Sequence, residues 1–107
     1  MDHRIIKAKQ LASFRQFLRE EERGEATVKK YLGEVERFSA WLSGALVTKT
    51  SVTAWKGYLL DQGYNPSTIN GKLTALDRFF RFLGWEDCRV KHLKLQRRLF
   101  RDDSREL

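Results

Sequence analysis

Apolar residues recur every three or four positions in four stretches of the chain, a spacing that predicts amphipathic helices. The first stretch runs roughly from 9 to 23 and the second from 25 to 42; the third follows Thr48, and the fourth lies between Asn65 and Gly84. In the fourth, the apolar stripe consists of Ile69, Leu73, Leu76, Phe80 and Leu83. No stretch alternates persistently between apolar and polar positions, so the predicted fold class is all-α.

A glycine follows each of these periodic stretches. Gly24, Gly44, Gly63 and Gly84 each follow a periodic stretch, where a residue that tolerates positive φ commonly ends a helix. The 107 residues are enough for one modest core. We therefore predict one helical domain over residues 9–86, preceded by a flexible segment, 1–8, and followed by a basic linker, 87–107.

Residue types also repeat at an offset of 41 positions. Leu11, Phe14, Leu18, Val28 and Leu32 are matched in kind by Val52, Trp55, Leu59, Ile69 and Leu73. The chain thus has the pattern of one helical hairpin written twice. Amphipathic helices of equal length can converge on similar patterns, and the sequence leaves both explanations open.

The outward faces of the second and fourth stretches have few bulky residues. In the fourth stretch that face carries Ser67, Gly71, Thr74, Arg78 and Arg81, and in the second Ala26, Lys30, Gly33, Arg37 and Ala40. Small and basic side chains suit a close approach to phosphate, whereas packing against another helix of the chain is the alternative. Because Lys30 and Lys72 lie outside the apolar stripes, alanine at either position is expected to leave the melting temperature nearly unchanged.

The net charge of +7 is concentrated near the C-terminus. Residues 89–101 contain six basic side chains and no acidic one, which leaves only +1 for the rest of the chain. This distribution favours a polyanionic partner, and nucleic acid over a membrane, because no apolar run approaches the length of a membrane span. The alternative is that the excess charge serves solubility.

The sequence offers few candidate residues for catalysis or metal binding. Cys88 is the single cysteine, and His3 and His92 are far apart in the sequence, so neither a disulfide nor a zinc site is expected. No nucleophile is paired with a base in a known catalytic motif. We expect no catalytic residue, no metal and no cofactor, and a cytoplasmic location because no signal peptide is evident.

Two motifs carry a resemblance to a known family. They are T-x-x-x-Y-x-x-x-x-x-x-F-x-x-W-L in TVKKYLGEVERFSAWL and P-S-T-I-N-x-x-L-x-x-L-x-x-F-F-x-F-L in PSTINGKLTALDRFFRFL, followed by the basic run KHLKLQRR. Over about residues 9–100, the chain resembles the N-terminal SAM-like core-binding domain of tyrosine recombinases, the phage-type integrases. The resemblance implies a four-helix orthogonal bundle of two hairpins that clamps one face of duplex DNA. It also implies that the chain is a non-catalytic fragment, because the family's catalytic residues belong to a separate C-terminal domain.

The resemblance further implies which residues face DNA. They belong to the first turns of the second stretch, to the fourth stretch and to the linker: Thr27, Lys29, Lys30, Ser67, Thr68, Asn70, Gly71, Lys72, Thr74, Lys91, Lys94, Arg97 and Arg98. Gly71 departs from the family in offering no side chain. The implied partners are double-stranded DNA and neighbouring recombinase protomers, with the isolated fragment a monomer and no membrane involved.

Two other functions compete with DNA binding by a recombinase module. A SAM-like helical domain can instead mediate protein–protein interaction, because a fold does not fix a function. A helix-turn-helix repressor is a weaker alternative, since no short two-helix unit with a tight turn stands out.

Overall fold

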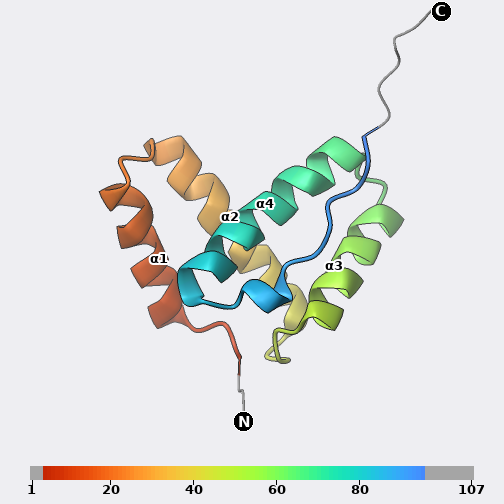
Figure 1. Cartoon of the computed structure of the whole chain (residues 1–107), viewed down its shortest axis with the longest axis horizontal. Coiled ribbons are helices and arrows are strands. Elements are labelled where there is room, and N and C mark those ends of the chain that lie inside the picture. The colour runs from red at the N-terminus through yellow and green to blue at the C-terminus, as the bar shows by residue number, and fades with distance from the viewer. Residues whose placement is uncertain (1–3, 96–107) are drawn as a thin grey trace, which may run out of the picture.

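The computed structural model describes residues 4–95 and contains four α-helices, α1 (Ala8–Glu20), α2 (Glu25–Leu42), α3 (Lys49–Asp61) and α4 (Pro66–Leu83). A short 3-10 helix, η1 (Glu86–Cys88), follows α4 (Figure 1). No strand occurs within residues 4–95. The all-α prediction is therefore confirmed, and the arrangement is that of a SAM-like helical bundle.

The two helical hairpins repeat each other in structure. Adding 41 to the bounds of α1 gives those of α3, and adding 41 to the bounds of α2 gives those of α4. The turns match as well: the Arg23 amide donates to the Leu18 carbonyl at 3.1 Å, and the Tyr64 amide donates to the Leu59 carbonyl at 3.3 Å. The repeat seen in the sequence thus corresponds to a repeated hairpin.

The first helix ends earlier than the pattern predicted. α1 stops at Glu20, and Gly24 does not close it: with φ −62° it is instead the N-cap of α2. The left-handed residue in this turn is Glu22, with φ 60°, at the position equivalent to Gly63, with φ 90°. The prediction for Gly24 was wrong because the turn needs its left-handed residue two positions earlier. Gly44, Gly63 and Gly84 have the predicted positive φ.

The core forms where α2 and α4 cross and the outer helices close around them (Figure 1). Phe14, Phe38, Phe79 and Phe80 are fully buried. The first helix of each hairpin packs an aromatic residue against an aromatic residue on the second helix of the other hairpin. The rings of Phe14 and Phe79 lie 5.2 Å apart, and those of their equivalents Trp55 and Phe38 lie 5.7 Å apart. Each hairpin therefore needs the other to bury its aromatic face.

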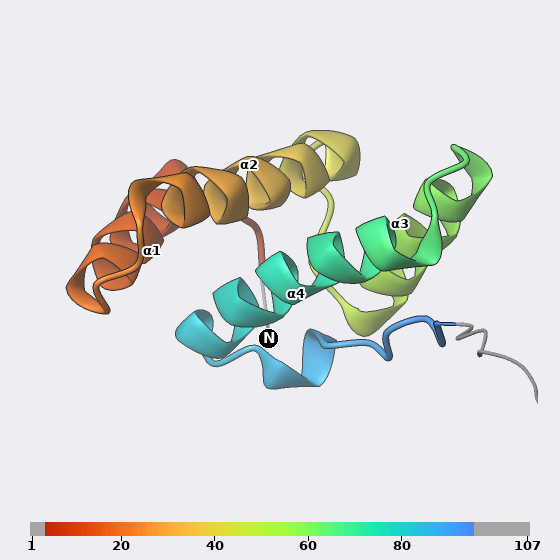
Figure 2. The same ribbon diagram turned by 90° about the horizontal axis from the view of Figure 1, so that it is seen from above.

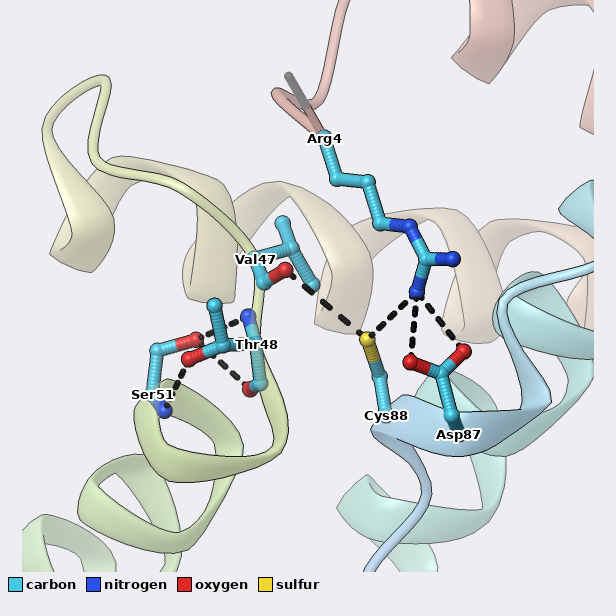
Figure 3. A network of polar contacts seen from close by, with 6 residues as sticks. All are labelled: Arg4, Val47, Thr48, Ser51, Asp87 and Cys88. Carbon is cyan, nitrogen blue, oxygen red and sulfur yellow. Dashed lines mark hydrogen bonds and ion pairs between the residues drawn. The ribbon is translucent and has the colours of Figure 1, made fainter. Parts of the chain in front are cut away.

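The N-terminal segment and η1 are joined by polar contacts (Figure 3). The Arg4 guanidinium donates to the Asp87 carboxylate at 2.7 Å, and the Val47 amide donates to the Arg4 carbonyl at 2.7 Å. This hydrogen bond from Arg4 lowers the pKa of Asp87. The adjacent Cys88 is buried, and its thiol lies 3.8 Å from the Val47 carbonyl. The contacts link three segments that are distant in the sequence.

Residues 89–95 run in extended conformation along α4, on the side opposite α2 (Figure 2). Val90 belongs to the hydrophobic core, as does Cys88, and Ile6 packs against the same core at the other end of the chain. The domain boundaries predicted at residues 8 and 86 stay predictions, although core packing extends past both.

Candidate nucleic-acid interface

The N-terminal ends of α2 and α4 lie at one edge of the molecule, away from the N-terminus of the chain, and the described part of the segment after η1 ends at the same edge (Figure 1). Lys29 and Lys30 are exposed in the first turns of α2, and Thr27 is half-buried. Ser67 and Thr68 are exposed at the start of α4. Five of the residues implied by the family resemblance are thus brought to one edge.

Asn65 starts α4 as the sequence predicted. Its side-chain oxygen accepts a hydrogen bond from the Thr68 amide at 2.9 Å, and Pro66 occupies the first turn. α2 begins differently, because its N-cap is Gly24, which has no side chain to accept such a bond. The two helix starts are therefore alike in position but not in capping.

Lys72, unlike Lys29 and Lys30, is largely buried. Its side chain is only 11% exposed, its ammonium lies 3.1 Å from the Glu34 carboxylate, and it stands over the Tyr64 ring at 4.9 Å from the centroid. Lys72 lies outside the apolar stripe of α4, yet its side chain is packed against α2, which argues against the small effect on melting temperature expected for alanine at this position. The apolar stripe could not show this, because Glu34, a buried acid on α2, supplies the partner.

Asn70 and Thr74 face residues 89–95. The Asn70 side chain donates to the Leu93 carbonyl at 2.9 Å and accepts from the Leu93 amide at 2.7 Å. The Thr74 hydroxyl donates to the Asn70 carbonyl at 2.9 Å and lies 3.1 Å from Nε2 of His92. These two side chains hold the extended segment against α4.

Lys91 and Lys94, on the extended segment, have exposed side chains. The Lys91 backbone carbonyl accepts a hydrogen bond from the Lys56 ammonium at 2.8 Å. The segment is thus tied to α3 as well as to α4. Arg97 and Arg98, the other predicted linker contacts, lie outside the described residues.

A carboxylate lies beneath this segment. The side chain of Asp77 is 18% exposed and lies 3.9 Å from both Arg89 and His92. Burial raises the pKa of Asp77, and the charges of His92 and Arg89 oppose that shift. Residues 89–95 therefore cover a carboxylate whose burial cost is only partly offset by the neighbouring positive charges.

Gly71 lies within α4, where glycine costs about 1 kcal/mol relative to alanine. A Cβ atom at this position would meet no heavy atom within 4 Å. Packing inside the chain therefore does not require glycine at residue 71, which weakens the helix-packing explanation for this residue. At Gly33, by contrast, a Cβ would stand 3.3 Å from the Arg37 guanidinium.

Two basic residues on the outward face of α4, Arg78 and Arg81, were not among the individual DNA contacts that the family resemblance implied. Arg78 and Arg81 line a pocket of about 310 Å³ with Arg23, and also an adjoining one of about 210 Å³ with Arg89. The signal was present, because Arg78 and Arg81 belong to the outward face of α4 that lacks acidic residues.

Residues 4–95 lack two features that would point to other functions. They contain no group of three or more His, Cys, Asp or Glu residues placed to hold a metal ion. None of their helices is both long and apolar enough to cross a membrane. The exposed polar side chains at the starts of α2 and α4 and on residues 89–95 include lysines and hydroxyls, which can donate hydrogen bonds to an anionic partner.

Comparison with known proteins identifies the family. Searches of curated proteins and of solved structures found no match. Residues 11–87 match the family described as phage integrase, N-terminal SAM-like domain, which covers most of the chain and all four α-helices apart from the first three residues of α1. This chain therefore belongs to the phage integrase N-terminal SAM-like domain family.

Proposed function

We propose that this chain is the DNA-binding module of a phage-type tyrosine recombinase and grips one face of a recombination-site duplex. The observation that carries the proposal is the shared edge of the molecule (Figure 1). The starts of α2 and α4 lie there with Lys29, Lys30, Ser67 and Thr68 at the surface. Exposed cations and hydroxyls on two helix starts suit phosphate contacts on both sides of a groove.

The segment after η1 supports the same proposal. Lys91 and Lys94 are exposed on it, and Asn70 holds it against α4 through two hydrogen bonds to Leu93. In this proposal Asn70, Thr74 and Lys72 shape the surface rather than contact DNA directly, and the open space beside Gly71 allows the helix to approach closely.

The proposal extends to the parent protein. Strand cleavage and joining belong to a separate catalytic domain, and this module contributes no catalytic residue. Neighbouring protomers would be its protein partners in the assembled recombination complex, and the isolated module would be a monomer. Affinity would come mostly from phosphate contacts, with few base contacts.

A titration of the chain with duplex DNA, followed by amide NMR shifts at two salt concentrations, tests the proposal. Shifts are expected at Thr27, Lys30, Ser67 and Thr68, and binding should weaken with a logarithmic slope of about −0.9 per phosphate contacted. Lys30→Ala should reduce that slope by about 0.9, whereas Lys9→Ala, an exposed cation on α1, should leave it unchanged. Absence of binding to any duplex, or binding independent of salt, refutes the proposal.

A protein-interaction module is the second candidate. The exposed fractions of Tyr58 and Leu60 on α3, 39% and 46%, favour it, since such side chains suit a protein partner. The same titration separates the two functions. A stable homo-oligomer without DNA-induced shifts at Lys30 or Ser67 would support protein interaction instead.

A further inference from the structure

Two surface pockets lie where the first helix of one hairpin meets the second helix of the other. The α1–α4 pocket, of about 310 Å³, is lined on one side by Phe17, Leu18, Glu21 and Arg23. The α2–α3 pocket, of about 410 Å³, is lined on one side by Tyr58, Leu59, Gln62 and Tyr64. The second set of residues is the first set shifted by 41 positions.

The opposite walls show the same relation. Arg78, Arg81 and Phe82 of α4 line the α1–α4 pocket, and Arg37, Ala40 and Trp41 of α2 line the α2–α3 pocket. Every residue lining the first pocket thus has its equivalent, 41 positions away, lining the second. The repeated hairpin thus places the same seven positions in both pockets, and the α2–α3 pocket is lined by Trp55 and Lys72 as well.

An aromatic pair lies in each pocket. The rings of Phe17 and Phe82 are 4.9 Å apart in the α1–α4 pocket, and those of Tyr58 and Trp41 are 5.8 Å apart in the α2–α3 pocket. An arginine occupies the equivalent place in both walls, Arg78 in one and Arg37 in the other. The shared design is an aromatic pair beside a guanidinium.

The electrostatics of the two pockets differ in strength. The α1–α4 pocket adds Arg81 and Arg23, although the Arg23 guanidinium lies 3.8 Å from the carboxylate of Glu21, which lines the same pocket. Arg78 forms no ion pair with another residue in the range 4–95.

The two cations of the α2–α3 pocket, Arg37 and Lys72, lie 3.5 Å and 3.1 Å from the Glu34 carboxylate, which offsets their charge. The Arg37 side chain nevertheless remains 63% exposed, so its guanidinium can reach a ligand. Both pockets suit an anion, and the α1–α4 pocket suits it better.

One residue of each pocket lies next to the start of a helix at the proposed DNA edge. Arg23 lies two residues before α2, and its equivalent Tyr64 lies two residues before α4. The two strands of a duplex are related by local two-fold symmetry, and the two pockets are related by the repeat of the hairpin. Arginine is also the side chain best suited to phosphate.

We propose that the α1–α4 pocket and the α2–α3 pocket bind the sugar-phosphate backbones of the two opposite strands of one duplex, flanking the groove that α2 and α4 approach. Arg78 and Arg37 are the equivalent phosphate contacts. The additional arginines, Arg23 and Arg81, make phosphate binding stronger at the α1–α4 pocket. This inference rests on the proposed function, which it deepens by adding two backbone contacts.

The test is the salt dependence of duplex binding by the whole chain and three variants. Arg78→Gln and Arg37→Gln should each reduce the logarithmic slope by about 0.9, and the double variant by about 1.8. The charge-matched control is Lys9→Gln with Arg15→Gln, two exposed α1 cations that line neither pocket, and its slope should equal that of the unchanged chain. Thermal melting confirms that each variant is folded.

Four results would overturn the inference. A reduced slope for Arg78→Gln with none for Arg37→Gln would overturn binding of both strands. Equal reductions in the α1 control would mean that total charge alone matters, and would overturn the role of the pockets. If the unchanged chain binds DNA and no variant alters its slope, this inference fails while the proposed function stands. If the unchanged chain binds no duplex, both fail.

Discussion

The ammonium of Lys72 lies 3.1 Å from the carboxylate of Glu34, and each side chain is only 11% exposed. This pair joins α4 to α2 beside the Tyr64 ring. Lys72→Ala should therefore lower the free energy of unfolding by about 1–3 kcal/mol, because the mostly buried Glu34 would lose its nearer partner and keep only the exposed Arg37, at 3.5 Å. Urea denaturation measures the change. Lys30→Ala, at an exposed position on α2, is the control and should change stability by less than about 0.5 kcal/mol. Equal stability of the two variants would contradict the assignment.

Asn70→Ala should release the extended segment from α4. The two hydrogen bonds between Asn70 and the Leu93 backbone would be lost, so hydrogen exchange at the Leu93 amide should accelerate. Ser67→Ala, an exposed change on the same helix, should leave that exchange rate unaltered. Unchanged protection of Leu93 in Asn70→Ala would show that other contacts, such as the burial of Val90, hold the segment.

Asp77 and Asp87 should affect acid stability in opposite directions. Burial raises the pKa of Asp77 above the ordinary 3.8, so its contribution is fully present below pH 3.8 and is lost as the pH rises through the folded-state value. Asp77→Asn should therefore be more stable than the unchanged chain at pH 7, and the difference should vanish below pH 3.8. Melting temperature measured as a function of pH tests this.

Asp87→Asn should change stability at pH 7 in the direction opposite to Asp77→Asn. The hydrogen bond from Arg4 lowers the pKa of Asp87 below 3.8, so its ionised form stabilises the fold above that pH and the stabilisation is lost as the pH falls. This variant should melt at a lower temperature than the unchanged chain at pH 7. Changes of the same sign in both asparagine variants would contradict the two assignments.

Glu22→Gly should stabilise the protein. Glu22 adopts φ 60°, a left-handed conformation that costs a non-glycine residue about 1–2 kcal/mol, and glycine relieves that cost in return for a smaller loss of chain entropy. A gain of about 0.5–1 kcal/mol in the free energy of unfolding is expected. The matched reverse change is Gly63→Ala at the equivalent position, which should destabilise by a similar amount. Destabilisation by Glu22→Gly would indicate that the Glu22 side chain makes a compensating contact.

Much of the fold was predictable because its signals are local. The apolar spacing located α2 and α4 correctly, and Asn65 and Pro66 marked the start of α4. The end of α1 was missed because its turn has Glu22, not glycine, in the left-handed conformation. In the equivalent turn a glycine, Gly63, marks that position in the sequence. The Lys72–Glu34 pair was missed because an ion pair between helices depends on how α2 and α4 cross, which hydrophobic periodicity does not encode.

By itself, the sequence determined the all-helical fold class, most helix bounds and the family, because helical periodicity, capping residues and motif spacing are properties of neighbouring residues. It left open whether the 41-residue repeat was a repeated hairpin. Only the tertiary structure decided which polar residues are available to a partner. Lys72 and Asn70 look as exposed in the sequence as Lys30, yet the fold pairs the first with Glu34 and the second with Leu93. The packing of each hairpin against the other also created the two equivalent pockets, whose walls come from helices of different hairpins.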